Sequence, residues 1–183
     1  TSIFEPIAGN AYAILGQGTA TQYMDNLGIW VGSLSEISPT SGYWLKLYEP
    51  TTFTVEAYPT DTRINYELLE GNNLISYVGV DSMDIGEAIP DEFEDHVQGI
   101  IGEGVASISH PTLGWVGSLS QFNHLKGYWF QVDQNMEYNW HIPDDLVRSV
   151  PAKPTIQKVV PEEFSYNQST QQAFYFIESI TIF

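Results

Sequence analysis

An internal repeat constrains the fold of this chain more than any other feature of its sequence. The two copies are separated by 86 residues at their first glycine (Gly16 to Gly102) and by 85 residues after a one-residue insertion at Ile29. The matching pieces are Gly16-x-Gly18-x-Ala20 with Gly102-x-Gly104-x-Ala106, Trp30-Val-Gly-Ser-Leu34 with Trp115-Val-Gly-Ser-Leu119, and Gly42-Tyr43-Trp44 with Gly127-Tyr128-Trp129. A register kept over so many positions indicates two homologous modules.

The repeat and the proline pattern predict four parts along the chain. We expect β module 1, a truncated copy, over residues 1–59 and β module 2 over residues 60–146. A Pro-rich linker follows over 147–163, and a C-terminal strand segment over 164–183. Module 2 has a longer lead-in before its glycine motif than module 1 has. Module 1 is therefore truncated, or its missing strands come from another segment or chain.

Short runs of β-branched and aromatic residues between glycine-rich turns predict an all-β fold. We expect two small sandwich-like or barrel-like modules, one short helix and a C-terminal extension strand. The helix is expected over 84–93, capped by Ser82 and limited to about two turns by Pro90. The expected strands are 43–48, 52–57, 73–78, 98–101 and 128–132.

The charge of the chain narrows the classes of partner. Of its 183 residues, 6 are Lys or Arg and 23 are Asp or Glu, so the formal net charge is −17. Binding to nucleic acid needs clustered cations, and the chain lacks them. No apolar run is long enough for a membrane-spanning helix. The absence of cysteine, the acidity and the abundance of Tyr, Thr, Ser and Asn favour an extracellular, cell-surface or virion-surface location.

The repeated aromatic residues are candidates for a sugar-stacking surface. Aromatic faces grip pyranose rings, and nearby Asn, Gln and acidic groups would hold the hydroxyls. The competing interpretation is that these rings form the core or the contact between modules, because consecutive residues of Gly-Tyr-Trp point to opposite faces of a strand. The candidate residues are Trp30, Tyr43, Trp44, Trp115, Tyr128, Trp129 and Trp140.

The densest acidic cluster is a candidate calcium site, with a solvated acidic face as the alternative. Calcium is the one cofactor that we consider, because it prefers several oxygen ligands, although the spacing does not match an EF-hand loop. The residues concerned are Asp81, Asp84, Glu87 and Asp91.

The sequence offers no catalytic constellation. The four histidines are scattered, neither Gly-x-Gly motif has the third glycine of a dinucleotide loop, and Ser33 and Ser118 lack a nearby acid–base partner. We therefore expect a protein that is not an enzyme.

An apolar segment near the C-terminus is the candidate for assembly. Gln172–Ile177 and Ser179–Phe183 are two apolar β stretches around Glu178, and an unpaired strand of this kind would aggregate. We expect it to pair by strand addition, with copies of the same chain or with neighbouring domains of a longer polypeptide. The pairing residues would be Ala173, Phe174, Tyr175, Phe176, Ile177, Ile180 and Ile182.

The Trp-Val-Gly-Ser-Leu and Gly-Tyr-Trp repeat, with Asn73-Leu-Ile-Ser-Tyr77 before its second copy, resembles glycine–aromatic β-modules of large secreted or cell-surface bacterial proteins. The resemblance covers residues 10–143, and residues 164–182 resemble the opening strands of a different module of such polypeptides. It implies extracellular display, repetition and non-enzymatic roles, and it brings no catalytic residues. The departures are at both ends, because module 1 lacks the Asn-Leu-Ile-Ser-Tyr strand and the last module stops after its first strands.

These observations predict a non-enzymatic structural protein of a cell-surface, secreted or virion assembly, associating by β-strand addition. The alternative is a carbohydrate-binding module that binds polysaccharide through the duplicated Trp and Tyr positions.

Overall fold

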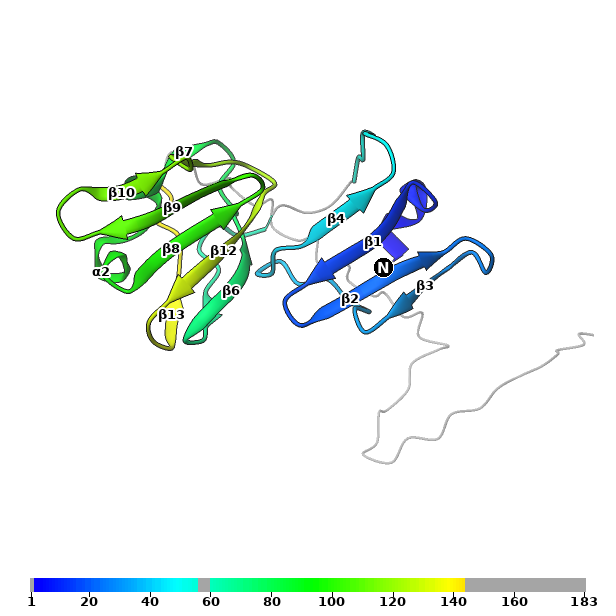
Figure 1. The fold of residues 1–183 in the computed structure, drawn as a ribbon, viewed down its shortest axis with the longest axis horizontal. Helices are drawn as coiled ribbons and strands as arrows, with labels where there is room; N and C mark the ends of the chain where they lie inside the picture. Colours follow the sequence, from blue (N-terminus) through cyan, green and yellow to red (C-terminus); the bar gives the residue numbers. More distant parts are fainter. Residues whose placement is uncertain (1, 56–59, 144–183) are drawn as a thin grey trace, which may run out of the picture. The chain divides into compact units, whose positions relative to one another are not determined.

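The computed structural model describes residues 2–55 and 60–143, which form a mostly β protein. All the ladders between its named strands are antiparallel (Figure 1). The all-β expectation is thereby confirmed. The described residues belong to one compact unit. The expected linker over 147–163 and the segment over 164–183 lie outside the described residues.

The N-terminal part forms one four-stranded sheet, drawn in blue and cyan in Figure 1. It begins with a 3-10 helix, η1 (Ser2–Ile7), which the sequence did not lead us to expect. The strands are β1 (Ala11–Gly16), β2 (Thr19–Met24), β3 (Ile29–Gly32) and β4 (Trp44–Leu47), in the spatial order β3-β2-β1-β4.

The second part is built around a five-stranded sheet in the order β10-β9-β8-β12-β6, with two further two-stranded ladders, β11-β7 and β13-β5. Its strands are β5 (Tyr66–Leu68), β6 (Gly71–Ser76), β7 (Met83–Asp84), β8 (Val97–Gly102), β9 (Val105–His110), β10 (Gly114–Gly117), β11 (Gln121–Phe122), β12 (Gly127–Val132) and β13 (Met136–Tyr138). The strands expected at 43–48, 73–78, 98–101 and 128–132 are thus present, with ends shifted by a few residues.

The two sheets repeat one pairing plan. Ile14 on β1 faces Thr21 and Leu45 on the neighbouring strands. At the matching place Ile100 on β8 faces Ser107 and Phe130. Strands β1 to β4 therefore correspond in order and register to β8, β9, β10 and β12. The difference lies at one edge, where β12 also pairs with β6.

The acidic segment forms two short helices where we expected one. They are α1 (Ile85–Ala88) and α2 (Asp91–Glu94), and Pro90 stands at the start of the second. The expected cap, Ser82, is wrong, because the Ser82 hydroxyl bonds to Asn123. The side chain of Asp84 caps α1 by accepting the backbone N–H of Gly86 at 3.1 Å.

The strand expected over 52–57 is not found in residues 51–55, and residues 56–59 lie outside the described part. The physical reason is the absence of a partner. The corresponding strand of the second part, β13, exists as a ladder with β5. No strand of the described N-terminal part matches β5, so the alternating pattern of Phe53 and Val55 has no backbone to pair with.

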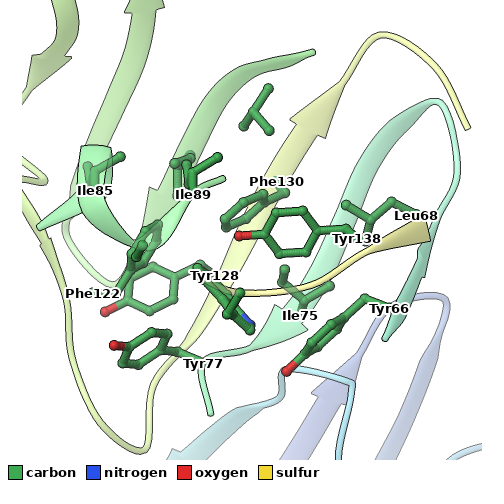
Figure 2. Packing of buried hydrophobic residues seen from close by; sticks show 14 of the residues in the cluster. Tyr66, Leu68, Ile75, Tyr77, Ile85, Ile89, Phe122, Tyr128, Phe130 and Tyr138 are labelled. Atoms are coloured by element: carbon green, nitrogen blue, oxygen red, sulfur yellow. The ribbon is translucent and has the colours of Figure 1, made fainter. Parts of the chain in front are cut away.

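The hydrophobic core lies in the second part, as Figure 2 shows. Tyr66, Phe122, Phe130 and Tyr138 are almost completely buried. Phe122 lies edge-on to Trp140 with ring centroids 4.7 Å apart, a favourable aromatic geometry. In the N-terminal part the described buried hydrophobic residues are Ile7, Ala11, Ile14 and Leu34, far fewer than in the second part.

Candidate functional site: the open edge of strand β4

The glycines of the repeated Val-Gly-Ser-Leu motif are required by close packing of two backbones. A Cβ atom added to Gly32 would overlap the carbonyl oxygen of Ala20, and one added to Gly117 would overlap that of Ala106. The repeat therefore preserves two equivalent close contacts between neighbouring strands.

The repeated serine makes the same hydrogen bond to the neighbouring strand in each sheet. Ser33 Oγ accepts the backbone N–H of Ala20 at 3.2 Å, and Ser118 Oγ accepts that of Ala106 at 3.2 Å. Both hydroxyls are engaged with the neighbouring backbone, which assigns these serines a structural role.

The hydroxyl of the repeated tyrosine forms a hydrogen bond with a loop in each part. The Tyr43 hydroxyl accepts the backbone N–H of Ser38 at 2.9 Å, and the Tyr128 hydroxyl accepts that of Asn123 at 2.8 Å. The tyrosine rings also lie against Gly16 and Gly102, the first glycines of the Gly-x-Gly motifs. These motifs are hairpin turns, with Gly18 at φ +69° and Gly104 at φ +72°.

The candidate sugar-binding aromatics do not form one group. Trp140 and Tyr128 are buried in the core, at 3% exposure each. Trp30 and Trp115 are partly buried, and the indole of Trp115 donates to Glu94 Oε1 at 2.9 Å. Trp44 and Trp129 are partly buried on corresponding strands, while their neighbour Tyr43 makes the loop hydrogen bond described above. The residues that still present a face to solvent are thus dispersed over both sheets.

The acidic residues proposed as calcium ligands do not come together in one site either. Over residues 2–55 and 60–143, the structure brings no three His, Asp or Glu side chains together as metal ligands. Asp84 is occupied as the cap of α1, and Asp81, Glu87 and Asp91 are exposed. In the same part of the chain, no helix is long and apolar enough to cross a membrane.

The edge of β4 distinguishes the two sheets. Trp129 on β12 has a cross-strand partner on both sides, Ile101 of β8 and Leu74 of β6. Its counterpart Trp44 on β4 pairs with Leu15 of β1 on one side. Among the described residues, no strand lies at the other side of β4 over residues 44–47. An open row of backbone N–H and C=O groups is a template for another strand.

Three apolar side chains of the N-terminal part are also less covered than their counterparts in the second part. Ile37 is 38% exposed and Val55 is 41% exposed, whereas the matching Phe122 and Trp140 are 0% and 3% exposed. Leu45 is partly exposed, whereas the matching Phe130 is buried. Leu45 and Val55 border a hollow of about 640 Å³, which Tyr77 and Val78 line from the other part. Apolar groups around a space of this size are suited to receive further apolar side chains.

A contact between the two parts was missed in the sequence. The Gln17 side chain accepts the backbone N–H of Leu74 at 2.8 Å and donates to the carbonyl of Asn72 at 3.1 Å. Gly42 donates its N–H to the Leu74 carbonyl at 2.9 Å. These bonds close the outer edge of β6. The available signal was the difference between the two Gly-x-Gly turns, because the second carries Glu103, which bonds to Lys126 at 3.1 Å.

The predicted assembly residues, from Ala173 to Ile182, lie outside the described part of the chain. Comparison with protein-family models, with curated proteins and with solved structures found no match to this chain.

Proposed function

We propose that this chain is a non-enzymatic structural protein of a cell-surface, secreted or virion assembly, built from two homologous β modules that associate by β-strand addition. One observation carries the proposal. Among the described residues, no strand pairs with β4 on the side where its counterpart β12 carries β6.

The use of the repeated residues supports a structural role. The glycine, serine and tyrosine of the repeat make the same contacts with backbone in both sheets. A side chain that is hydrogen-bonded to the backbone or packed against it in this way is not free to act as a nucleophile or to bind a ligand. Folding therefore accounts for the repeated glycine, serine and tyrosine without a repeated active site.

The acidity of the chain fits a subunit that must stay soluble before it assembles. A net charge of −17 opposes contact between copies in solution. Because salt screens this repulsion over about 8–10 Å at physiological ionic strength, association should strengthen as salt is added.

The test is the oligomeric state of the full chain. We expect multi-angle light scattering to give a mass above one chain. We also expect the mass to fall to one chain in the quadruple variant Phe174→Lys, Phe176→Lys, Ile180→Lys and Ile182→Lys. A matched control places four lysines at Gln157, Asn167, Gln168 and Gln171, which adds the same charge near that segment. If the wild-type chain is a monomer, or if both variants behave alike, the proposal fails.

A second candidate function is binding of a polysaccharide to the outer faces of the sheets. The specific observation is that Trp44 and Trp129 occupy equivalent, partly exposed positions beside Leu15 and Ile101. Sugar titration should then quench tryptophan fluorescence saturably, and Trp44→Ala or Trp129→Ala should weaken the binding. No quenching with a panel of soluble polysaccharides would dismiss this function.

A further inference from the structure

We propose that the open edge of β4 accepts residues 172–177 of a second copy of this chain, in the place that β6 occupies on β12. This inference rests on the proposed function and adds to it the acceptor site, the occupant and the place of the new strand.

The first argument comes from the register of β12. Residues Gly127 to Val132 pair with Ser76 to Gly71 of β6. The corresponding residues 42–47 of the N-terminal sheet begin with Gly42, which bonds to Leu74, and continue as β4. The open stretch is therefore residues 44–47. A strand added there would run antiparallel to β4, as β6 does to β12.

The second argument is what a strand in this position has to bury. The consecutive residues Asn73, Leu74 and Ile75 of β6 are all buried, so that strand is covered on both faces. A strand beside β4 would meet Trp44 on one face and Leu45 and Leu47 on the other, because side chains alternate along a strand. The occupant must then be apolar on both faces.

Residues 173–177 meet this requirement. They read Ala-Phe-Tyr-Phe-Ile, a continuous apolar run, and with Gln172 they match the six residues of β6 in length. The second apolar stretch, Ser179–Phe183, follows directly and could cover the exposed Ile37 and Val55. This role is filled in the second part by Tyr66 and Tyr77, whose rings pack edge-on to Trp140.

Charge and length agree with this occupant. Residues 159–183 contain Glu162, Glu163 and Glu178 and no basic residue, whereas Lys46 is exposed on β4. Residues 144–171 precede the strand, and at about 3.3 Å per residue they can span roughly 90 Å, enough to reach a neighbouring copy. Pro151, Pro154 and Pro161 favour an extended linker, which would carry the strand away from its own sheet.

The absence of cysteine permits a direct test by cross-linking. One tagged copy carries Lys46→Cys, a second copy with another tag carries Tyr175→Cys, and the two are co-expressed as full chains and treated with a short bis-maleimide. The matched control replaces Lys46→Cys with Gln131→Cys, the exposed counterpart of Lys46 on the closed strand β12. We expect at least about tenfold more cross-linked heterodimer with Lys46→Cys, because docking raises the local concentration to millimolar values.

A second measurement guards against a cysteine variant that fails to fold. In the unmodified full chain, the backbone amides of residues 44–47 should exchange slowly with deuterium. In the full chain carrying Phe174→Lys and Phe176→Lys, those that face away from β1 should exchange at least about tenfold faster, because edge amides without a partner are open to water.

The outcomes separate this inference from the proposed function. In one outcome the chain forms oligomers that depend on residues 172–183, but Lys46→Cys gives no cross-link. This outcome would overturn β4 as the acceptor and would leave assembly through the C-terminal strand intact. Cross-links confined to a single chain in a Lys46→Cys, Tyr175→Cys double variant would overturn both, since the segment would then close its own sheet. Equal cross-linking of Lys46→Cys and Gln131→Cys would overturn the inference.

Discussion

The side-chain amide of Gln17 bonds to the backbone of β6 as a strand would, accepting the N–H of Leu74 at 2.8 Å. Its Nε2 donates to the carbonyl of Asn72 at 3.1 Å, so one residue satisfies two groups of an exposed strand edge. An edge of this kind is otherwise open to unwanted pairing. The N-terminal hairpin turn thus protects the outer edge of the five-stranded sheet, whereas no described strand pairs with the outer side of β4.

Gln17→Ala should destabilise this contact by about 1 kcal/mol, the usual net value of hydrogen bonds of this kind. The readout is hydrogen exchange at the Leu74 amide, which should become faster, together with the midpoint of urea unfolding. Glu103→Ala is the control, because Glu103 occupies the same place in the second hairpin turn and bonds to the exposed side chain of Lys126. An unchanged Leu74 amide in Gln17→Ala would show that the bond contributes nothing in solution.

The repeat allowed much of the fold to be predicted, for a definite physical reason. Gly32 and Gly117, or Ser33 and Ser118, each contact one adjacent strand, so local sequence encodes a local register. Gln17 escaped prediction because its partners, Asn72 and Leu74, lie far along the chain and are bonded through their backbone. Which backbone groups will accept or donate a hydrogen bond cannot be recognised from the identity of their residues.

The strand expected over 52–57 failed because alternation alone does not make a strand. The alternation around Phe53 predicted a strand, but a strand also needs a partner, and the N-terminal sheet has no described counterpart of β5. The shorter lead-in of module 1 implied an open sheet edge, but the residues of β4 do not show that β4 is the strand concerned. That follows from comparing β4 with β12 once the ladders are known.

Gly117→Ala should be severely destabilising, by about 3 kcal/mol or more, because the new methyl would overlap the backbone of Ala106 and Ser107. Gly99→Ala in the same sheet is the matched control. Its Cβ would lie 3.6 Å from the nearest atom, the carbonyl oxygen of Ser107, which is an ordinary contact. We expect thermal unfolding to show a large loss of stability for Gly117→Ala and a loss of about 1 kcal/mol or less for Gly99→Ala. Equal losses would argue against close strand packing as the reason for the repeated glycine.

The repeated tryptophans differ in one hydrogen bond, which offers a gain-of-stability prediction. Trp115 Nε1 donates to Glu94 Oε1 at 2.9 Å, whereas Trp30 Nε1 is buried and has no hydrogen-bond partner among the described residues. In the register of the repeat, Ala8 precedes Ile14 by the same number of residues by which Glu94 precedes Ile100. Ala8→Glu should therefore raise the free energy of unfolding by about 1 kcal/mol, and Glu94→Ala should lower it by a similar amount.

Chemical denaturation of the two variants checks this pair of predictions. Glu94→Gln is the control, because the amide oxygen can still accept the indole N–H and should keep most of the stability. A destabilising effect of Ala8→Glu would mean that Ala8 and Glu94 are not structurally equivalent.

The buried tyrosines should make the protein sensitive to alkaline pH. Burial raises the pKa of Tyr77 to about 12 and raises the pKa of Tyr138 well above its usual value of 10.0. The unfolded chain loses these protons near pH 10, so the tyrosines leave stability unchanged below that pH. Above pH 10 the unfolded state gives up protons that the folded state keeps, and the free energy of unfolding falls by up to about 1.4 kcal/mol per pH unit for each tyrosine.

Tyr138→Phe tests this pH dependence because it removes one of the ionisable hydroxyl groups. The Tyr138 hydroxyl is buried and has no hydrogen-bond partner in residues 2–55 and 60–143, so its removal should be nearly neutral or slightly stabilising at pH 7. Between about pH 10 and pH 12 the free energy of unfolding, measured by urea unfolding, should fall less steeply with pH in the variant than in the wild type. The difference in slope should correspond to one proton. Tyr48→Phe, at a tyrosine that is 65% exposed, is the control and should keep the wild-type slope. A slope that is the same for all three proteins would show that Tyr138 ionises in the folded state as easily as in the unfolded chain.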